Sequence, residues 1–228
     1  MSAIVYNAIT DTMSMILTQK GTDMIKGTPE LIFERREEII NACEKLYETM
    51  SFKEITLKEI GNEVPFSRPT IYNYFQTKEE IFLALFRREY ERWIIDLVAI
   101  YNENECLGKE ELASKIAKSL ADRPQLLKLI AMNIYDMEGN SRVELLTELK
   151  LTYRKLIDTF EVIFEKFLSG MTKEEIKKRL YMFFSFIFGV YPMTNATQKQ
   201  REAMKNADID FVQVSEYELT YDFLLKLI

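Results

Sequence analysis

The sequence predicts an all-α fold, in which a small three-helix unit near the N-terminus precedes a larger helical bundle. Seven glycines and five prolines are few for 228 residues, and the apolar residues rarely show the strict alternation that half-buried strands need. Helix-start signals also recur along the chain. Because 47% of the residues are hydrophobic, the chain can bury a sizeable core.

Many helix starts are marked by Ser or Thr followed three residues later by Glu, because these side chains form a reciprocal capping box that satisfies otherwise unpaired N–H groups. Five pairs have this spacing: Thr56 with Glu59, Thr77 with Glu80, Ser141 with Glu144, Thr172 with Glu175, and Ser215 with Glu218. Two further starts combine a capping residue with an early proline, namely Thr28 with Pro29 and Asp122 with Pro124.

These starts and the apolar periodicity predict the helices in order. We expect them at about residues 29–49, 57–63, 68–75, 78–101, 109–121, 124–137, 141–168, 172–191 and 215–228. The polar stretch 196–213 leaves room for a further short helix, and residues 1–27 form an N-terminal extension of undetermined order. In the first helix, one buried face should consist of Ile32, Ile39, Cys43, Leu46 and Met50.

Cysteine and histidine usage argues against catalytic or metal chemistry. Cys43 and Cys106 lie far apart in sequence without a CxxC spacing, so both are expected to be ordinary buried apolar residues. The chain has no histidine, which removes the commonest general base and the commonest metal ligand. We therefore expect no enzyme, no metal site and no cofactor.

Membrane insertion and export are not expected either. The most apolar run, Tyr181–Met193, is well short of the roughly 20 residues that span a bilayer. The first basic residue is Lys20, so the cationic start of a secretory signal is missing. These features predict a cytoplasmic protein that does not enter the membrane.

The segment 56–78, TLKEIGNEVPFSRPTIYNYFQTK, has the pattern of a helix-turn-helix. Such a motif needs a buttressing helix, a tight turn, and a second helix with one apolar and one polar face. Pro65 should end the first helix at Val64, because the residue before a proline avoids helical backbone. The second helix should pack inward through Ile71 and Phe75.

The polar face of this second helix suits double-stranded DNA. Arg68 can bind guanine bidentately, Asn73 can pair with adenine, and Thr70 can touch a thymine methyl group. Tyr74 is also expected on the outward surface. Phosphates can be held by Ser67, Tyr72 and Lys78. The expected DNA-binding residues are Thr56, Lys58, Ser67, Arg68, Pro69, Thr70, Tyr72, Asn73, Tyr74 and Lys78.

The segment resembles the N-terminal domain of the TetR family of transcriptional regulators. The residues in the family's order and spacing are Thr56, Ile60, Ser67, Arg68, Thr70, Tyr72, Tyr74, Phe75 and Lys78. The resemblance implies a dimeric regulator, a repressor, that binds a palindromic operator and is released by a small-molecule inducer. It implies a DNA-binding domain over 28–77 and a regulatory and dimerisation domain over 78–228. It also implies phosphate contacts for Ser67, Tyr72 and Lys78, and base contacts for Arg68, Thr70 and Asn73.

Two prolines depart from the family pattern. Pro65 stands where the family usually has a glycine, and its fixed φ cannot supply a positive φ, so we expect the turn to close differently. Pro69 replaces a small residue, but a proline in the first turn costs little because that N–H lacks an intrahelical partner. It leaves the Thr70 N–H for a Ser67 cap. These departures bear on the approach angle to DNA.

Charge is distributed unevenly along the chain. The net charge of −6 argues against non-specific coating of nucleic acid. Yet the stretch Val64–Lys78 contains Arg68 and Lys78 and no acidic residue, in a protein that has 36 of them. The acid-free stretch lies where DNA would bind.

The C-terminal helices suggest a dimer and a ligand pocket. The helix after Thr172 is so apolar that a twofold interface would bury the excess, and the resemblance likewise implies dimerisation through the last long helices. The expected dimer residues are Phe184, Phe188, Tyr191, Tyr217 and Leu224. The resemblance also implies an inducer pocket, and the lack of charged clusters suggests a largely apolar inducer. Candidate lining residues, which also suit a plain core, are Trp93, Tyr135, Tyr153, Phe164 and Phe183.

Other functions fit the same helices. A helical protein-interaction module on this fold could have lost DNA binding through Pro65 and the acidic surface. The polar face of the second helix could also be ordinary solvated surface of a larger bundle. An enzyme would need a nucleophile and base set, and the sequence shows none.

Overall fold

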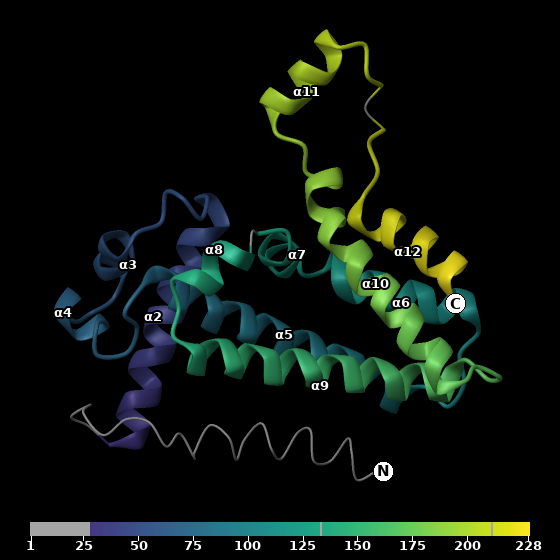
Figure 1. Ribbon diagram of the computed structural model, residues 1–228, viewed down its shortest axis with the longest axis horizontal. Coiled ribbons are helices and arrows are strands. Elements are labelled where there is room, and N and C mark those ends of the chain that lie inside the picture. Colours follow the sequence, from purple (N-terminus) through teal and green to yellow (C-terminus); the bar gives the residue numbers. More distant parts are fainter. Residues whose placement is uncertain (1–27, 133, 211) are drawn as a thin grey trace. The chain divides into compact units, whose positions relative to one another are not determined.

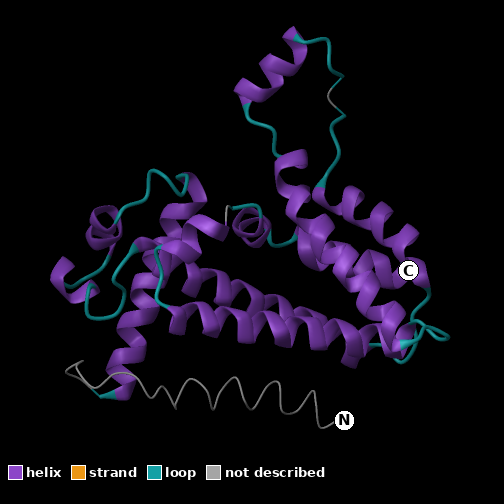
Figure 2. Ribbon diagram, in the orientation of Figure 1, coloured by secondary structure: helices purple, strands orange, loops and turns teal. Residues whose placement is uncertain are grey.

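The computed structural model describes residues 28–132, 134–210 and 212–228, and this part of the chain consists of helices and loops (Figure 1, Figure 2). The predicted all-α fold is confirmed. The predicted extension 1–27 lies outside the described residues. The helices are α2 Pro29–Thr49, α3 Leu57–Glu63, α4 Arg68–Ile71, α5 Lys78–Glu103, α6 Lys109–Ala121, α7 Pro124–Ile130, α8 Ile134–Gly139, α9 Val143–Phe167, α10 Lys173–Thr194, α11 Gln198–Asn206 and α12 Glu216–Leu227.

The chain divides into two compact units. Within the described residues, unit 1 consists of 28–89 and 134–155, and unit 2 consists of 90–132 and 156–228. Unit 1 therefore contains α2, α3, α4 and α8, and unit 2 contains α6, α7, α10, α11 and α12. The long helices α5 and α9 contribute residues to both units. No helix in the described ranges is long and apolar enough to cross a bilayer.

Several helices begin where local capping chemistry predicts. At α10, the Thr172 N–H donates to the Glu175 carboxylate at 2.8 Å and the Glu175 N–H donates to the Thr172 hydroxyl at 3.3 Å. The same reciprocal pair starts α12 at Ser215 and Glu218. A further capping box, formed by Thr197 with Gln200, starts α11 within the polar stretch near the C-terminus.

Two predicted starts are wrong because the capping groups instead make local contacts at the end of the preceding helix. The Ser141 hydroxyl donates to the Met137 carbonyl at 2.7 Å, so it closes the end of α8, and α9 begins at Val143. Asp122 ends α6 instead of starting α7, and its carboxylate pairs with Lys118 at 2.9 Å.

Two predicted helices are shorter than expected. The helix predicted at 124–137 stops at Ile130, and α8 follows from Ile134. Apolar residues continue across this break, so their periodicity does not reveal it. The predicted helix 68–75 is helical only to Ile71. Residues 72–74 instead continue as a turn, in which the Tyr74 N–H donates to the Ile71 carbonyl at 2.9 Å.

The core of unit 1 joins α2, α3, α4 and the start of α5. Ile39 and Cys43 are fully buried, as the predicted face requires, but Ile32, Leu46 and Met50 are only half-buried. The buried face of α2 includes Ile40 and Tyr47 instead. The Tyr47 ring packs edge-on against Phe82 of α5 at 5.0 Å. Burying aromatic and aliphatic side chains of this size contributes about 1.5–3 kcal/mol each.

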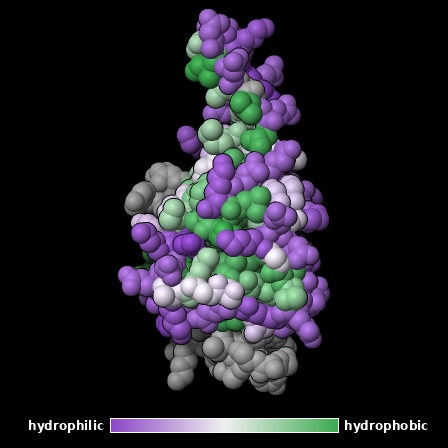
Figure 3. Space-filling model, turned by 90° about the vertical axis from the view of Figure 1, so that its right-hand side faces the viewer, coloured by the Kyte–Doolittle hydropathy of each residue, from purple (hydrophilic) through white to green (hydrophobic). Residues whose placement is uncertain are grey.

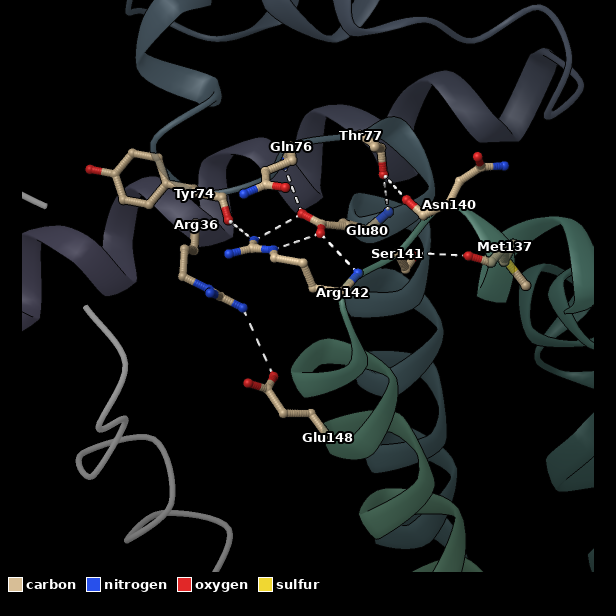
Figure 4. A network of polar contacts seen from close by, with 10 residues as sticks. All are labelled: Arg36, Tyr74, Gln76, Thr77, Glu80, Met137, Asn140, Ser141, Arg142 and Glu148. Atoms are coloured by element: carbon tan, nitrogen blue, oxygen red, sulfur yellow. Dashed lines mark hydrogen bonds and ion pairs between the residues drawn. The ribbon is translucent and has the colours of Figure 1, made fainter. Parts of the chain in front are cut away.

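A polar network joins the start of α5 to the junction between α8 and α9 within unit 1 (Figure 4). The Arg142 guanidinium donates to both carboxylate oxygens of Glu80, at 2.7 and 2.9 Å, and to the Tyr74 carbonyl at 3.2 Å. Glu80 also accepts from the Gln76 N–H at 2.7 Å. The Thr77 hydroxyl donates to the Asn140 carbonyl at 2.9 Å. We call Glu80, Arg142 and the Tyr74 carbonyl the junction network.

The Glu80 side chain is 1% exposed, so its ionised form must be stabilised by these hydrogen-bond donors and not by water. Burial by itself raises the pKa of Glu80, but the hydrogen bonds from Arg142 and from the Gln76 N–H outweigh it and hold the pKa below its usual range. The Thr77–Glu80 capping box is therefore only half-formed. The Glu80 N–H donates to the Thr77 hydroxyl at 3.2 Å, while the Glu80 carboxylate binds elsewhere.

The core of unit 2 is an aromatic cluster. The Phe160 ring lies edge-on to Trp93 at 5.3 Å and to Phe183 at 5.4 Å. The indole N–H of Trp93 donates to the Ser119 hydroxyl at 3.0 Å, so the buried donor is satisfied. In the same unit, α12 packs on α6 and α10, and Phe223 of α12 stacks on Phe186 of α10 at 3.8 Å.

The two cysteines differ in environment and should differ in reactivity. Burial raises the pKa of the Cys43 thiol to about 12, whereas Cys106 is exposed, which corrects the expectation that both are buried. Since the thiolate is the reactive form, we expect one fast and one slow thiol when the native protein reacts with an aromatic disulfide reagent. Cys106→Ser should remove the fast phase. Two equally fast phases would contradict the burial of Cys43.

The junction network should make stability depend on pH in acid. The pKa of Glu80 is lowered by folding, so its stabilising contribution is present above the unfolded pKa of about 4.3 and is lost as pH falls through the folded pKa. The free energy of unfolding of Glu80→Gln, measured with urea, should therefore fall less steeply between about pH 5 and pH 3 than that of the parent protein. Glu110→Gln, at an exposed position, is the matched control. Equal pH slopes for all three proteins would refute this role of Glu80.

Candidate nucleic-acid interface

The buttressing helix α3 is capped and closely packed. The Thr56 hydroxyl accepts from the Lys58 N–H at 3.1 Å and bonds to the Glu59 carboxylate, which lowers the pKa of Glu59. Ile60 is fully buried. At Gly61, an added Cβ would lie 3.6 Å from the Cβ of Arg68, so α3 and α4 meet closely at this glycine. A Cβ there would make ordinary van der Waals contact with α4.

The turn between α3 and α4 closes without a residue in the left-handed region. Val64 is extended, with φ −106° and ψ 150°, as the residue before a proline prefers. Positive φ occurs in the described residues at Asp208 and Gly170, both far from this turn in sequence. A glycine is therefore not needed at Pro65, and the turn fits the fixed φ of proline.

The second helix, α4, starts at Ser67 with different capping contacts from those predicted. The Thr70 N–H donates to the Ser67 carbonyl at 2.8 Å, and the Ser67 hydroxyl bonds to the Thr70 hydroxyl at 3.0 Å. The expected cap from the Ser67 hydroxyl to the Thr70 N–H is therefore wrong. Pro69 lies in the first turn of α4, where its missing donor is tolerated.

The outward side of the motif presents polar groups and no acidic side chain from the stretch 64–78. The exposed members of the predicted set are Thr56, Lys58, Ser67, Arg68, Pro69, Tyr72 and Asn73, and Thr70 is half-buried. Ile71 and Phe75 are fully buried, as predicted. The Arg36 guanidinium of α2 lies 5.0 Å from the centre of the Phe75 ring. The motif therefore has one apolar and one polar face.

The orientation predicted for Tyr74 is wrong. Its side chain is 3% exposed, and its carbonyl accepts from Arg142. Because the chain turns after Ile71 instead of continuing as a helix, helical spacing places this residue on the wrong side. Tyr74 therefore supports the motif from within and does not lie on its outer surface.

Lys78 is engaged within the chain. Its ammonium group donates to the carbonyls of Phe52 and Ile55, at 2.7 and 3.0 Å, and lies 4.2 Å from the centre of the Phe52 ring. These contacts tie the loop before α3 to the start of α5. A phosphate contact by Lys78 stays a prediction, and it would compete with these two carbonyls.

Three residues that support the motif were not predicted from the sequence. Gly61 lies where α3 packs against Arg68 and Ile71 of α4, whereas Glu80 and Arg142 bind the chain where it leaves α4. The sequence offers a signal for Glu80 only as part of a capping box. Arg142 lies 62 residues away, and nothing local marks it as a partner.

The aromatic residues proposed for a ligand pocket only partly come together. Trp93, Phe164 and Phe183 are fully buried in unit 2, and Phe160, which is not among the proposed pocket residues, lies against all three. Tyr153 belongs to unit 1. The Tyr135 side chain lies outside the described residues.

The residues proposed for dimerisation also fall into two groups. Phe184 and Leu224 are 5% and 0% exposed, so they pack inside their own chain and cannot form the centre of an interface. Phe188 is 50% exposed. Tyr191 and Tyr217 are half-buried. Further exposed apolar side chains on α10 are Tyr181, Met182 and Met193.

Comparison with known proteins identifies the family. Residues 39–85 match the family model of bacterial regulatory proteins of the tetR family, and residues 87–222 match the model of the tetracyclin repressor-like C-terminal domain. No curated protein matches the chain. The fatty acid degradation regulator FadR from Bacillus halodurans has 16% sequence identity and a TM-score of 0.53, over 89% of this chain and 97% of that one.

The MbdR regulator from Azoarcus sp. CIB shares the fold as well, with 18% identity and a TM-score of 0.50 over 84% of this chain and 97% of that one. At these identities the two solved structures support the fold alone. The two family models together span the helix-turn-helix and most of the helices that follow it. The chain therefore belongs to the TetR family, whose members are DNA-binding transcriptional regulators and not enzymes.

Proposed function

We propose that this chain is a repressor that binds a palindromic operator as a homodimer and is released by a small, largely apolar inducer. Residues 28–77 bind DNA, and residues 78–228 regulate and dimerise. The observation that carries the proposal is the exposed polar face of the helix-turn-helix, in which residues 64–78 include no acidic residue although the chain has a net charge of −6.

Within this face, each exposed group has a role that fits its chemistry. Arg68 and Asn73 contact base edges in the major groove, and Thr70 touches a thymine methyl group. The phosphates are held by Thr56, Lys58, Ser67, Tyr72 and, where it gives up its carbonyl partners, Lys78. Pro69 contacts the groove wall. A small patch of this kind supports specific binding without the broad basic surface that non-specific binding needs.

A homodimer places two such faces on one operator. Apolar side chains gather on one face of the molecule (Figure 3). On α10, the apolar side chains of Tyr181, Met182 and Phe188 are exposed. Exposed apolar patches of this sort mark protein interfaces, and a twofold axis repeats the same patch on both partners. Two recognition helices about 34 Å apart would then read the two halves of a palindrome.

The inducer is proposed to act in unit 2. Trp93, Phe164 and Phe183 pack against Phe160 there, and a site formed among these aromatic side chains would favour an uncharged apolar molecule. An inducer releases the operator only by binding one conformation of the protein more tightly than the other. The alternative function, a protein-interaction module with weakened DNA binding, rests on the acidic surface of the remaining chain.

A salt-titrated gel shift on the region upstream of the protein's own gene tests the proposal. The affinity should fall steeply as salt rises, because phosphate contacts release counterions. A fragment of equal length from inside the gene is the control, and it should bind only at low salt. If neither fragment shifts at any salt concentration, the protein-interaction module is the better account.

Replacing Arg68 tests the base contacts. Arg68→Ala should weaken operator binding by about 1–3 kcal/mol and relax the preference at one base pair in each half-site, because a bidentate contact to guanine is lost. Arg201→Ala on α11, also exposed, is the matched control and should bind as the parent does. If Arg68→Ala keeps the affinity and base preference of the parent, Arg68 does not contact the bases.

Replacing Phe188 tests the dimer. Phe188→Glu should shift the protein toward monomer in sedimentation, because it places a charge in an apolar interface. Operator affinity should fall with it, since one recognition helix reads only a half-site. Val143→Glu replaces another exposed apolar residue, 66% exposed at the start of α9, and should leave the dimer intact. A dimeric Phe188→Glu protein would place the interface elsewhere.

A further inference from the structure

The exit from the recognition helix is held by a residue far away in the sequence. After Ile71 the chain turns, and at Tyr74 its carbonyl points toward the Arg142 guanidinium at 3.2 Å (Figure 4). Arg142 lies just before α9, in the stretch that the sequence assigns to the regulatory domain. The compact units group residues 134–155 with the helix-turn-helix instead. The junction of α8 and α9 is thus structurally part of the DNA-binding unit.

Arg142 holds this exit through a buried charge. The Glu80 carboxylate accepts from the Arg142 side chain and from the N–H groups of Arg142 and Gln76, at 3.2 and 2.7 Å respectively. The Arg142 guanidinium therefore binds two groups of the segment 74–80, the Tyr74 carbonyl and the Glu80 carboxylate. Because Glu80 is 1% exposed, water cannot readily replace Arg142, and a buried charge without its partner is costly.

The recognition helix needs an external support of this kind. It has only four residues, whereas isolated helices shorter than about 12 residues are marginal in water. It also lacks a side-chain hydrogen bond at its N-cap. Its position must therefore come from the burial of Ile71 and Phe75 and from the anchoring of the chain that follows.

A second contact from α9 supports the inward face of the same motif. Glu148 lies 2.8 Å from Arg87 of α5 and 4.0 Å from Arg36 of α2. Arg36 in turn lies over the Phe75 ring. Arg142, just before α9, thus contacts the motif at the end of α4, and Glu148 of α9 forms an ion pair with Arg36 at its inner face.

We infer that Arg142 is a positioning residue for DNA reading, because it fixes the exit from α4 on the junction of α8 and α9 and so sets the pose of Arg68, Thr70 and Asn73. This inference rests on the proposed function. Arg142, which lies outside the helix-turn-helix, would thus increase operator affinity without contacting DNA.

The test compares Arg142→Ala with Arg123→Ala. Arg123 also binds a carboxylate and a carbonyl, in unit 2, where it donates to one carboxylate oxygen of Asp96 at 2.8 and 2.5 Å and to the Arg92 carbonyl at 2.9 Å. Both variants lose one guanidinium that binds a carboxylate and a carbonyl, so both should melt at a lower temperature. Only Arg142→Ala should bind operator more weakly, by about tenfold, the factor that corresponds to one lost charged hydrogen bond.

The salt dependence separates positioning from a direct contact. The Arg142 side chain is 42% exposed, so a phosphate contact is the competing explanation for any loss of affinity. Loss of a phosphate contact lowers the slope of log K against log salt by about one per half-site, whereas a positioning role leaves the slope unchanged. An unchanged slope with tenfold weaker binding is the expected result.

Milder variants keep the test decisive if Arg142→Ala does not fold. Glu80→Gln keeps the shape of the side chain but removes its charge, and Arg142→Lys keeps the charge but loses the fork. Both should weaken operator binding, and their effects should not add in the double variant, because they break one interaction. Operator binding equal to that of the parent in these variants would overturn the inference, as would an equal loss in Arg123→Ala or a reduced salt slope. If the parent protein itself binds no operator, the proposed function fails instead.

Discussion

The shortness of the recognition helix is the constraint on which the DNA-binding unit depends. A helix of four residues satisfies few of its own backbone groups and cannot hold a pose by itself. Its geometry therefore comes from its surroundings. Ile71 and Phe75 are buried beneath it, α3 meets it at Gly61, and the Arg142 guanidinium binds the carbonyl at its exit. The exposed polar residues are presented by a scaffold that extends well beyond the motif.

The same constraint explains why a carboxylate and a guanidinium lie at this position. Glu80 must be charged to accept several hydrogen bonds, and its burial is tolerated because Arg142 and two N–H groups satisfy it. In unit 2, by contrast, an aromatic cluster around Phe160 forms the core. The proposed inducer site thus lies in an apolar environment, and the DNA-binding unit is held by directional polar contacts.

Local chemistry predicts much of the fold. The starts of α10 and α12 follow from Thr172 and Ser215 with their glutamates, because both partners lie within one turn. The exposed face of α4 likewise follows from the burial of Ile71. The failures have a different origin. Ser141 is taken by the end of α8, and Tyr74 turns inward where α4 has already ended.

Residues whose roles depend on distant partners could not be predicted. Arg142 and Glu80 are separated by 62 residues, and no spacing rule connects them. Phe184 and Leu224 were expected at a subunit interface, but neighbouring helices of the same chain bury them. An apolar stripe shows that a helix face is covered, and only the tertiary structure shows whether the same chain covers it.

Mapping the DNA that the protein binds across its genome would test whether two copies of its exposed polar face read one operator. We expect a small number of strongly bound sites that share an inverted repeat, with half-site centres about one helical turn, or a multiple of it, apart. Arg68→Ala expressed at the same level should lose the guanine preference within each half-site. Bound regions that share no sequence, or single half-sites without a repeat, would contradict the reading of a palindrome by two copies of the protein.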